Sequence, residues 1–238
     1  IQYAVNRNGG AFYKSTNRGA SFTGIWGFGG GGGWNSPFVI SPSNPSVLYF
    51  GDTQVWKTTT GGSSWLASGT LDGGSTALSI AICATNPDTA IIGMAPFVTT
   101  AHVFRTTNGG SSWTNITGIL PDRYPIDLAI DPRNSKTMYA AMGGFGTGHL
   151  FKSIDAGLDW ADISGTLPDA PATALAVDPL NSNYVYVGND LGVYLSTNGG
   201  STWTPFSLGL PDAVIVADLV VSPSNRSLRC ITHGNGAY

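Results

Sequence analysis

All side-chain carboxylates in this sequence come from a single residue type. Its 238 residues contain no Glu, so all 14 acidic side chains are Asp. Acid–base hydrolysis of a glycosidic bond needs two carboxyl groups, one protonated and one ionised. Most Asp residues stand in recurring turn motifs, such as Leu-Pro-Asp at 120–122 and 167–169. Asp52 and Asp190 lie in corresponding loops and are the carboxylates to test if the chain is an enzyme.

Histidine and tryptophan offer a second kind of candidate site. His102 and His149 both stand four residues before a recurring octet, and His233 lies in the equivalent loop of the last repeat. Three imidazoles on one face would suit metal or acid–base chemistry. Their repeats are not all adjacent, however, and a shared structural role in strand entry is favoured for the first two. Trp26 and Trp34 flank a run of glycines and have no counterpart in the other repeats. Such a pair either stacks on sugar rings or anchors a partner protein, or else it plugs the channel of the fold or packs on a neighbouring blade that is absent here.

Metal and cofactor sites find no support in the sequence. The two cysteines, Cys83 and Cys230, lie inside apolar runs of different repeats, and no CxxC pair or Cys/His cluster occurs. A zinc site needs such a cluster. We therefore expect no metal and no cofactor. Buried free thiols are favoured over a disulfide between the two cysteines.

An octet that occurs five times must position all of these residues. It starts at positions 15, 58, 106, 153 and 196. A period of 43 to 48 residues marks an array of one supersecondary unit. A short polar third residue and a glycine at the fifth place suit a tight turn, because the first accepts backbone N–H groups and the second adopts positive φ. These turn residues are Asn17, Gly19, Thr60, Gly62, Asn108, Gly110, Asp155, Gly157, Asn198 and Gly200.

Each period holds four predicted strands. An aromatic residue two places before the octet and a Trp or Phe at its end frame a hairpin, and two short apolar runs complete the unit. With 33 Gly, 14 Pro and few good helix formers, the chain is all-β. We predict one β-propeller domain over 1–238, with about five four-stranded blades and partial repeats at 1–26 and 214–238. Either the two ends complete one blade together or the sequence is a segment of a larger propeller, and we favour the segment.

The octets resemble the Asp-box, or bacterial neuraminidase repeat, S-x-D-x-G-x-T-W. This repeat is found in sialidases, sortilin-type receptors, xyloglucan-hydrolysing glycosidases and secreted bacterial surface proteins. The resemblance covers nearly the whole chain and implies a propeller in which the box is a structural turn at the blade periphery. One catalytic Asp of the xyloglucan-hydrolysing enzymes stands in Y-A-R-T-D-V-G-G-A-Y. Residues 3–12 follow that pattern with Arg7 in place of the Asp, and the F-R-I-P segment of sialidases is missing.

Charge and loop variation give the functional expectation. A net charge of −3 with 11% charged residues supplies no basic patch for nucleic acid, and no apolar run is long enough to span a bilayer. The loops between second and third strands and the connections between blades vary most, so we expect the ligand face there. We predict a non-catalytic, secreted or cell-surface bacterial propeller. Its partner would be a polysaccharide, a protein, or other copies or modules of the same longer protein. The alternative is part of a xyloglucanase-like glycosidase whose catalytic Asp pair lies partly outside this segment.

Overall fold

The computed structural model describes residues 1–5, 11–26, 36–207 and 209–238, and in these residues the chain forms six antiparallel sheets. We number the sheets one to six in chain order. Sheet one contains β1 (Gln2–Val5), β2 (Phe12–Ser15) and β3 (Thr23–Trp26), and sheet six contains β20 (Val216–Val221), β21 (Leu228–Thr232) and β22 (Gly236–Ala237). Sheets two to five have four strands each.

The strands of the four-stranded sheets follow one another in chain order. Sheet two is β4 (Phe38–Ile40), β5 (Leu48–Gly51), β6 (Gln54–Thr58) and β7 (Leu66–Thr70); sheet three is β8 (Ala77–Ile82), β9 (Ala90–Met94), β10 (His102–Thr106) and β11 (Thr114–Asn115). Sheet four is β12 (Pro125–Ile130), β13 (Met138–Met142), β14 (Leu150–Ser153) and β15 (Ala161–Asp162); sheet five is β16 (Ala172–Val177), β17 (Val185–Asn189), β18 (Gly192–Ser196) and β19 (Thr204–Pro205).

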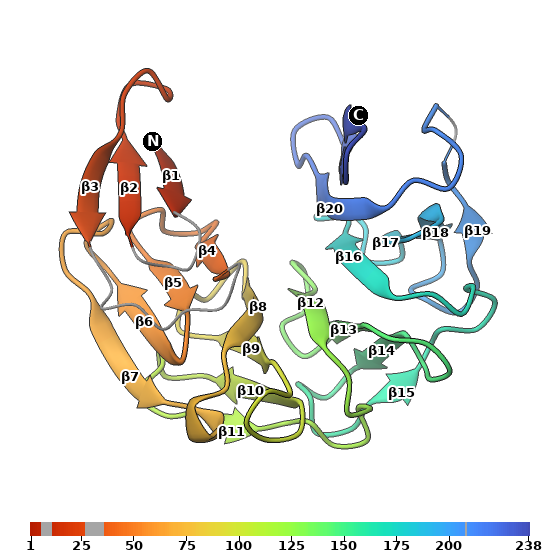
Figure 1. Ribbon diagram of the computed structural model, residues 1–238, viewed down its shortest axis with the longest axis horizontal. Coiled ribbons are helices and arrows are strands. Elements are labelled where there is room, and N and C mark those ends of the chain that lie inside the picture. The colour runs from red at the N-terminus through yellow and green to blue at the C-terminus, as the bar shows by residue number, and fades with distance from the viewer. Residues whose placement is uncertain (6–10, 27–35, 208) are drawn as a thin grey trace.

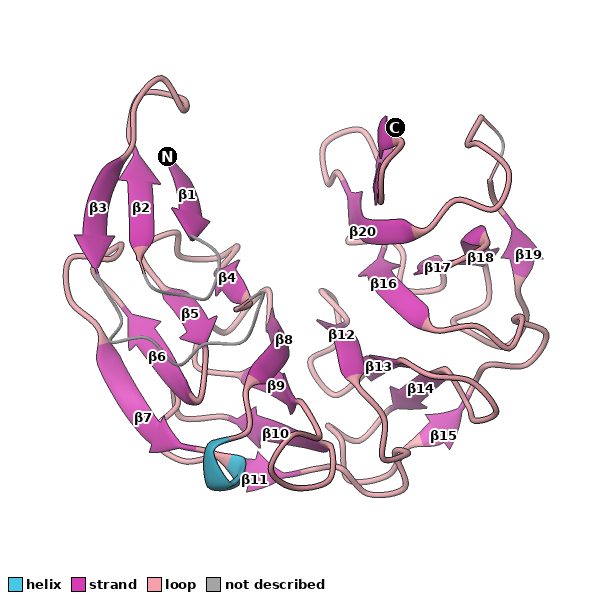
Figure 2. Ribbon diagram, viewed as in Figure 1, coloured by secondary structure: helices cyan, strands magenta, loops and turns pink. Residues whose placement is uncertain are grey.

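The sheets stand side by side in an arc, as blades of a propeller (Figure 1). Strands dominate throughout, and the one helix among the described residues is a 3-10 turn at Asp72–Gly74 (Figure 2). The first strands of neighbouring sheets contact one another from β4 to β8, β12, β16 and β20, so they form the inner rim. No helix in the described part of the chain is long and apolar enough to cross a membrane.

The predicted number of about five blades was wrong, because the structure has six. The prediction counted octets, and sheet six contains none, yet β20, β21 and β22 pair as a sheet of their own. The partial repeat at the start also forms a separate sheet, with β2 between β1 and β3. Both end sheets have three strands among the described residues, so the description as four-stranded holds for sheets two to five only.

The core lies between sheets rather than inside one of them. Five apolar clusters fill the five junctions between neighbouring sheets. At the junction of sheets four and five, for example, Tyr139 and Leu150 pack with Leu175, Val187 and Trp203. The second strands β9, β13 and β17 are buried along their whole length, as expected for short apolar runs covered on both faces. Cys83 and Cys230 are both buried and free.

The octets form the turns between third and fourth strands. In the fourth octet the Gly157 N–H donates to Ser153 Oγ over 2.8 Å, and the Asp159 N–H donates to Asp155 Oδ1 over 3.0 Å. Gly157 has a φ of 87°, which only glycine adopts without strain. The other four octets repeat this pattern with Gly19, Gly62, Gly110 and Gly200 at the positive φ. The first residue of the octet is therefore as important to the turn as the third.

Neighbouring sheets are joined by polar contacts in both directions along the chain. Going forward, Lys14 and Lys152 donate to the carbonyl groups of Gly61 and Gly199 in the octet of the next sheet, over 2.9 and 2.8 Å. Arg105 reaches the next octet in the same way. Going back, three octet tryptophans, Trp113, Trp160 and Trp203, bond to the preceding sheet, as Trp160 Nε1 does to the Ile116 carbonyl over 2.7 Å.

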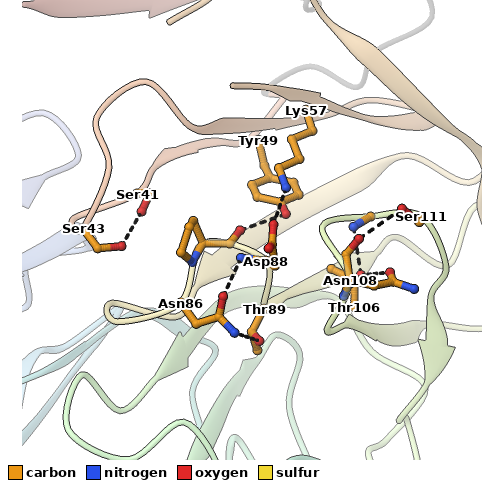
Figure 3. A network of polar contacts seen from close by, with 12 residues as sticks. Ser41, Ser43, Tyr49, Lys57, Asn86, Asp88, Thr89, Thr106, Asn108 and Ser111 are labelled. Atoms are coloured by element: carbon orange, nitrogen blue, oxygen red, sulfur yellow. Dashed lines mark hydrogen bonds and ion pairs between the residues drawn. The ribbon is translucent and has the colours of Figure 1, made fainter. Parts of the chain in front are cut away.

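Sheets two and three show the forward contact in a second form. Lys57 Nζ donates to Asp88 Oδ1 over 2.7 Å and lies over the ring of Tyr49, whose hydroxyl donates to the Pro87 carbonyl (Figure 3). Asp88 belongs to the turn between β8 and β9, and its carbonyl accepts the Gly109 N–H of the octet. In each of sheets two to five, such a backbone hydrogen bond joins the octet to the turn between the first and second strands, so the two form one continuous edge.

Candidate functional site

The irregular segments gather at the opposite ends of the strands from the octets. Asp122, in the connection from sheet three to sheet four, accepts the Ala101 N–H of the loop between β9 and β10 over 2.8 Å. Tyr124 of that connection accepts the Gly143 N–H of the loop between β13 and β14, also over 2.8 Å. We call this side the loop face and the side with the octets the turn face.

Three exposed aromatic rings lie on the loop face. Phe97 and Phe145 are each 62% exposed and Tyr124 is 44% exposed. The rings of Phe97 and Tyr124 meet edge to face with their centroids 6.1 Å apart. Phe145 comes two residues after Gly143, whose N–H donates to the Tyr124 carbonyl. We call Phe97, Tyr124 and Phe145 the aromatic patch. Phe97 and Tyr124 are in contact, and exposed aromatic rings grouped on one side of a domain are typical of a binding site.

A polar cleft of about 550 Å³ begins next to Phe145. It is lined by residues 146–149 on one side and by Asp162, Ser164, Gly165, Leu167 and Asp169 on the other. Gly148 lets the Asp162 carboxylate approach closely, since a Cβ there would lie 2.3 Å from Asp162 Oδ2. The Gly146 N–H holds the pKa of Asp169 below its usual range, and His149 adds to that effect, so Asp169 is ionised at neutral pH. The cleft thus offers two carboxylates to the hydroxyl groups of a ligand.

The three histidines do not form one site. His149 is buried, and its Nε2 lies 2.9 Å from Asp169 Oδ1 in the connection that follows sheet four. His102 Nδ1 lies 2.7 Å from Asp72 Oδ1 in the connection that precedes sheet three. His233 is exposed on sheet six. The described residues contain no group of three or more His, Cys, Asp or Glu side chains suited to a metal ion.

The two candidate catalytic carboxylates are also apart. Asp52 is buried in a turn of sheet two, where its Oδ1 accepts the Gln54 N–H over 2.6 Å and lies 3.4 Å from Trp56 Nε1. Asp190 lies between β17 and β18 in sheet five, with sheets three and four in between. The buried polar residue of that loop is Asn189, which accepts the Leu191 N–H. Asp52 and Asp190 therefore form no acid–base pair.

Of the two candidate tryptophans, only Trp26 lies among the described residues. Trp26 ends β3 and is paired with Phe12 in the sheet. Trp34, the glycine run and Arg7 lie outside the described residues. Trp26 and Trp34 were candidates because they are aromatic residues without a counterpart in the other repeats. Phe97, Tyr124 and Phe145 share this property, but they were not predicted as site residues.

Comparison with solved structures gives the same overall fold. Neither a protein-family model nor a curated protein sequence matches the chain. The GH74 enzyme of Niastella koreensis is similar at a TM-score of 0.72 and 24% identity over 97% of this chain and 41% of that one. An ancestral GH74 enzyme is similar at 0.67 and 26% over 85% of this chain and 28% of that one. YCF48 from Cyanidioschyzon merolae is similar at 0.70 and 14%, over 95% of this chain and 73% of that one. The chain is thus a six-bladed β-propeller that spans less than half the length of either GH74 enzyme.

Proposed function

We propose that this chain is a non-catalytic propeller that binds a polysaccharide on its loop face, as part of a secreted or cell-surface protein. The observation that carries the proposal is the aromatic patch. Sugar rings have apolar C–H faces that pack on aromatic side chains, and rigid exposed aromatics lose little entropy on binding. Phe97 and Tyr124 already support each other in the free chain. The patch is therefore formed before a ligand arrives.

The charges beside the patch favour a neutral polysaccharide. The cleft next to Phe145 holds the carboxylates of Asp162 and Asp169, and its one basic group, His149, is engaged with Asp169. Carboxylates accept hydrogen bonds from sugar hydroxyl groups but repel uronate or sialate groups. We therefore expect β-glucans and related neutral chains to bind better than acidic ones.

A GH74-like glycosidase completed by residues outside this chain is the second candidate. The likeness to two GH74 enzymes, at 24% and 26% identity, favours it. Asp52 and Asp190 would not be its catalytic pair, because Asp52 is buried and bonded within its own turn. Asp162 and Asp169, which share one cleft, would be the carboxylates to examine first.

Binding measurements on the purified chain test the proposal. We expect xyloglucan and mixed-linkage β-glucan to bind and polygalacturonate not to bind in isothermal titration calorimetry. Tyr124→Ala should weaken binding about tenfold, the effect of losing a central aromatic contact. Phe22→Ala is the matched control, since Phe22 is 45% exposed at the end of an octet on the turn face.

Two results would contradict the proposal. One is the absence of binding to every neutral polysaccharide, and the other is binding that Tyr124→Ala and Phe97→Ala leave unchanged. A reducing-end assay run in parallel separates the candidates. Release of new ends by the wild-type chain, lost in Asp169→Asn, would establish the glycosidase instead.

A further inference from the structure

The Leu-Pro-Asp motif recurs in three of the connections between sheets. Its copies end at Asp122, Asp169 and Asp212, in the connections that follow sheets three, four and five. All three aspartates are exposed. The first two nevertheless accept hydrogen bonds from the backbone of the preceding sheet's loop between second and third strands. These two loops carry Phe97 and Phe145 of the aromatic patch, so the motif supports the patch from behind.

The loop that carries Phe145 is rich in glycine. Residues 143–148 include four glycines, and Phe145 lies between Gly144 and Gly146, whose φ angles are 93° and 72°. Glycine loses more conformational freedom on ordering than any other residue. The Gly146 N–H donates to Asp169 Oδ1 over 2.7 Å, and no other backbone N–H from 144 to 148 is hydrogen-bonded within the described part of the chain. Asp169 is therefore the main support of this loop.

Asp169 also fixes the end of the same loop. Its Oδ1 lies 2.9 Å from His149 Nε2, and His149 is buried. The His149 N–H donates in turn to Ser164 Oγ over 2.8 Å. Because Gly146 and His149 meet one carboxylate oxygen, the segment between them is closed into a small ring. Phe145 directly precedes Gly146, so this ring determines where the exposed aromatic side chain stands.

Asp122 supports the loop of Phe97 in a similar way. Its Oδ1 accepts the N–H of Ala101, which comes four residues after Phe97, over 2.8 Å. Tyr124 stands two residues after Asp122, so this hydrogen bond ties together the segments that carry the edge-to-face pair. The loop has a second support, since its Val98 N–H donates to a serine in the connection before sheet three. Asp122 is thus less critical than Asp169.

The third copy of the motif has no long loop beside it. The loop of sheet five spans only 190–191, whereas those of sheets three and four span 95–101 and 143–149. Asp212 accepts no hydrogen bond from a described residue. It carries the same side chain in the same motif on the loop face, without a loop to support. The chain therefore contains its own control for the role of the other two aspartates.

We propose that Asp122 and Asp169 are positioning residues of the polysaccharide site, an inference that rests on the proposed function. Each orders a loop with an aromatic ring before the ligand arrives. A loop that is already ordered loses little entropy on binding, so its support raises affinity without a contact to the ligand. The role requires a hydrogen-bond acceptor at Oδ1 but no charge. Asparagine keeps a carbonyl oxygen at this place and should replace either aspartate.

Calorimetry with xyloglucan tests the positioning role. Asp169→Ala should weaken binding about fivefold, and Asp122→Ala about threefold, because the second loop keeps another support. Asp169→Asn should bind like the wild type, and so should the matched control Asp212→Ala. Asp169→Ala should add little to the loss caused by Phe145→Ala, because both changes remove the same ordered ring.

Limited digestion of the free chain by chymotrypsin reports on the loop without a ligand. Cleavage after Phe145 should be at least about fivefold faster in Asp169→Ala than in the wild type or Asp169→Asn, because a released loop fits a protease more readily. Cleavage after Phe97 in the same digest is the internal reference, and circular dichroism of each variant confirms its fold.

The outcomes separate this proposal from the proposed function. Unchanged affinity in Asp169→Ala would overturn the positioning role. An equal loss in Asp169→Asn would overturn it too, and would indicate that the carboxylate contacts the ligand directly. If the wild type binds no neutral polysaccharide, the proposed function fails. Digestion then decides about the loop alone, and equal cleavage rates in the wild type and Asp169→Ala would overturn its support by Asp169.

Discussion

The turn face and the loop face of this propeller lie at opposite ends of the same strands but differ in how regular their contacts are. On the turn face, an octet, a neighbouring turn and a cation from the preceding sheet recur with nearly the same distances. On the loop face, each connection has its own length and its own contacts, such as Asp122 to Ala101 and His149 to Asp169. Repetition thus holds neighbouring sheets together, and departure from repetition leaves aromatic rings such as Phe97 and Phe145 exposed to solvent.

The largest difference between the faces should appear in stability. Trp160 is 6% exposed and bonds to the Ile116 carbonyl of the preceding sheet, so Trp160→Ala should lower the free energy of unfolding by about 3–5 kcal/mol. Tyr124→Ala removes a half-exposed ring on the loop face and should cost less than about 1 kcal/mol. Urea unfolding of both variants measures the two values. Equal losses would show that the loop face also contributes to the core.

Two glycines, one on each face, allow a second comparison of stability with a smaller expected effect. Gly157 on the turn face and Gly146 on the loop face both have positive φ, at 87° and 72°. A Cβ on Gly157 would lie 2.5 Å from Ile116 Cδ1, whereas a Cβ on Gly146 meets nothing within 4 Å. Gly157→Ala should therefore cost about 2–3 kcal/mol and Gly146→Ala only about 1 kcal/mol of backbone strain. Thermal melting of the pair decides this, and a larger loss at Gly146 would contradict it.

A further effect concerns pH and comes from the inner rim. Burial raises the pKa of Asp127 to about 7, against the opposing N–H groups of Leu175 and Leu128. The folded chain then binds a proton that the unfolded chain has released, so this group makes stability fall as pH rises from about 4 to about 7. Because Asp127 is partly exposed, we expect a loss of about 2 kcal/mol rather than the full value of the shift.

The matched measurement compares unfolding of the wild type and Asp127→Asn at about pH 5 and about pH 8. The difference between the two curves isolates the contribution of Asp127 from that of other carboxyl groups, such as Asp178. The pKa of Asp178 is lowered, because burial raises it less than the Leu180 N–H and Arg226 lower it. Parallel curves for the two proteins would show that Asp127 does not titrate in this range.

The repeat made the strands and the octet turns predictable, because a turn is decided by a few neighbouring residues. Blade number was not predictable in the same way, since sheet six pairs its strands without an octet. His102 and His149 share a sequence register, yet they use different ring nitrogens and bond to Asp72 and Asp169 from connections on opposite sides of their sheets. Register fixes the backbone position of a side chain but not the loop that it meets.

The aromatic patch escaped prediction for a related reason. The sequence of an irregular segment does not indicate whether a phenylalanine in it packs inward or faces solvent. The conformation of the folded loops determines which of the two occurs. Phe97 and Phe145 are exposed, while Phe12 and Phe50 are fully buried, although all four stand near glycine or small residues in the sequence. Solvent exposure is therefore the property that the sequence encodes least directly here.

The two-way contacts between neighbouring sheets have a mechanical consequence. Since these contacts join each sheet to the one before it or after it among the described residues, the arc resembles a row of nearest-neighbour couplings. Under tension applied to its two ends, such a row should yield sheet by sheet from an end, in steps of similar length set by the repeat. A pulled molecule would then extend in a sawtooth rather than in one cooperative rupture.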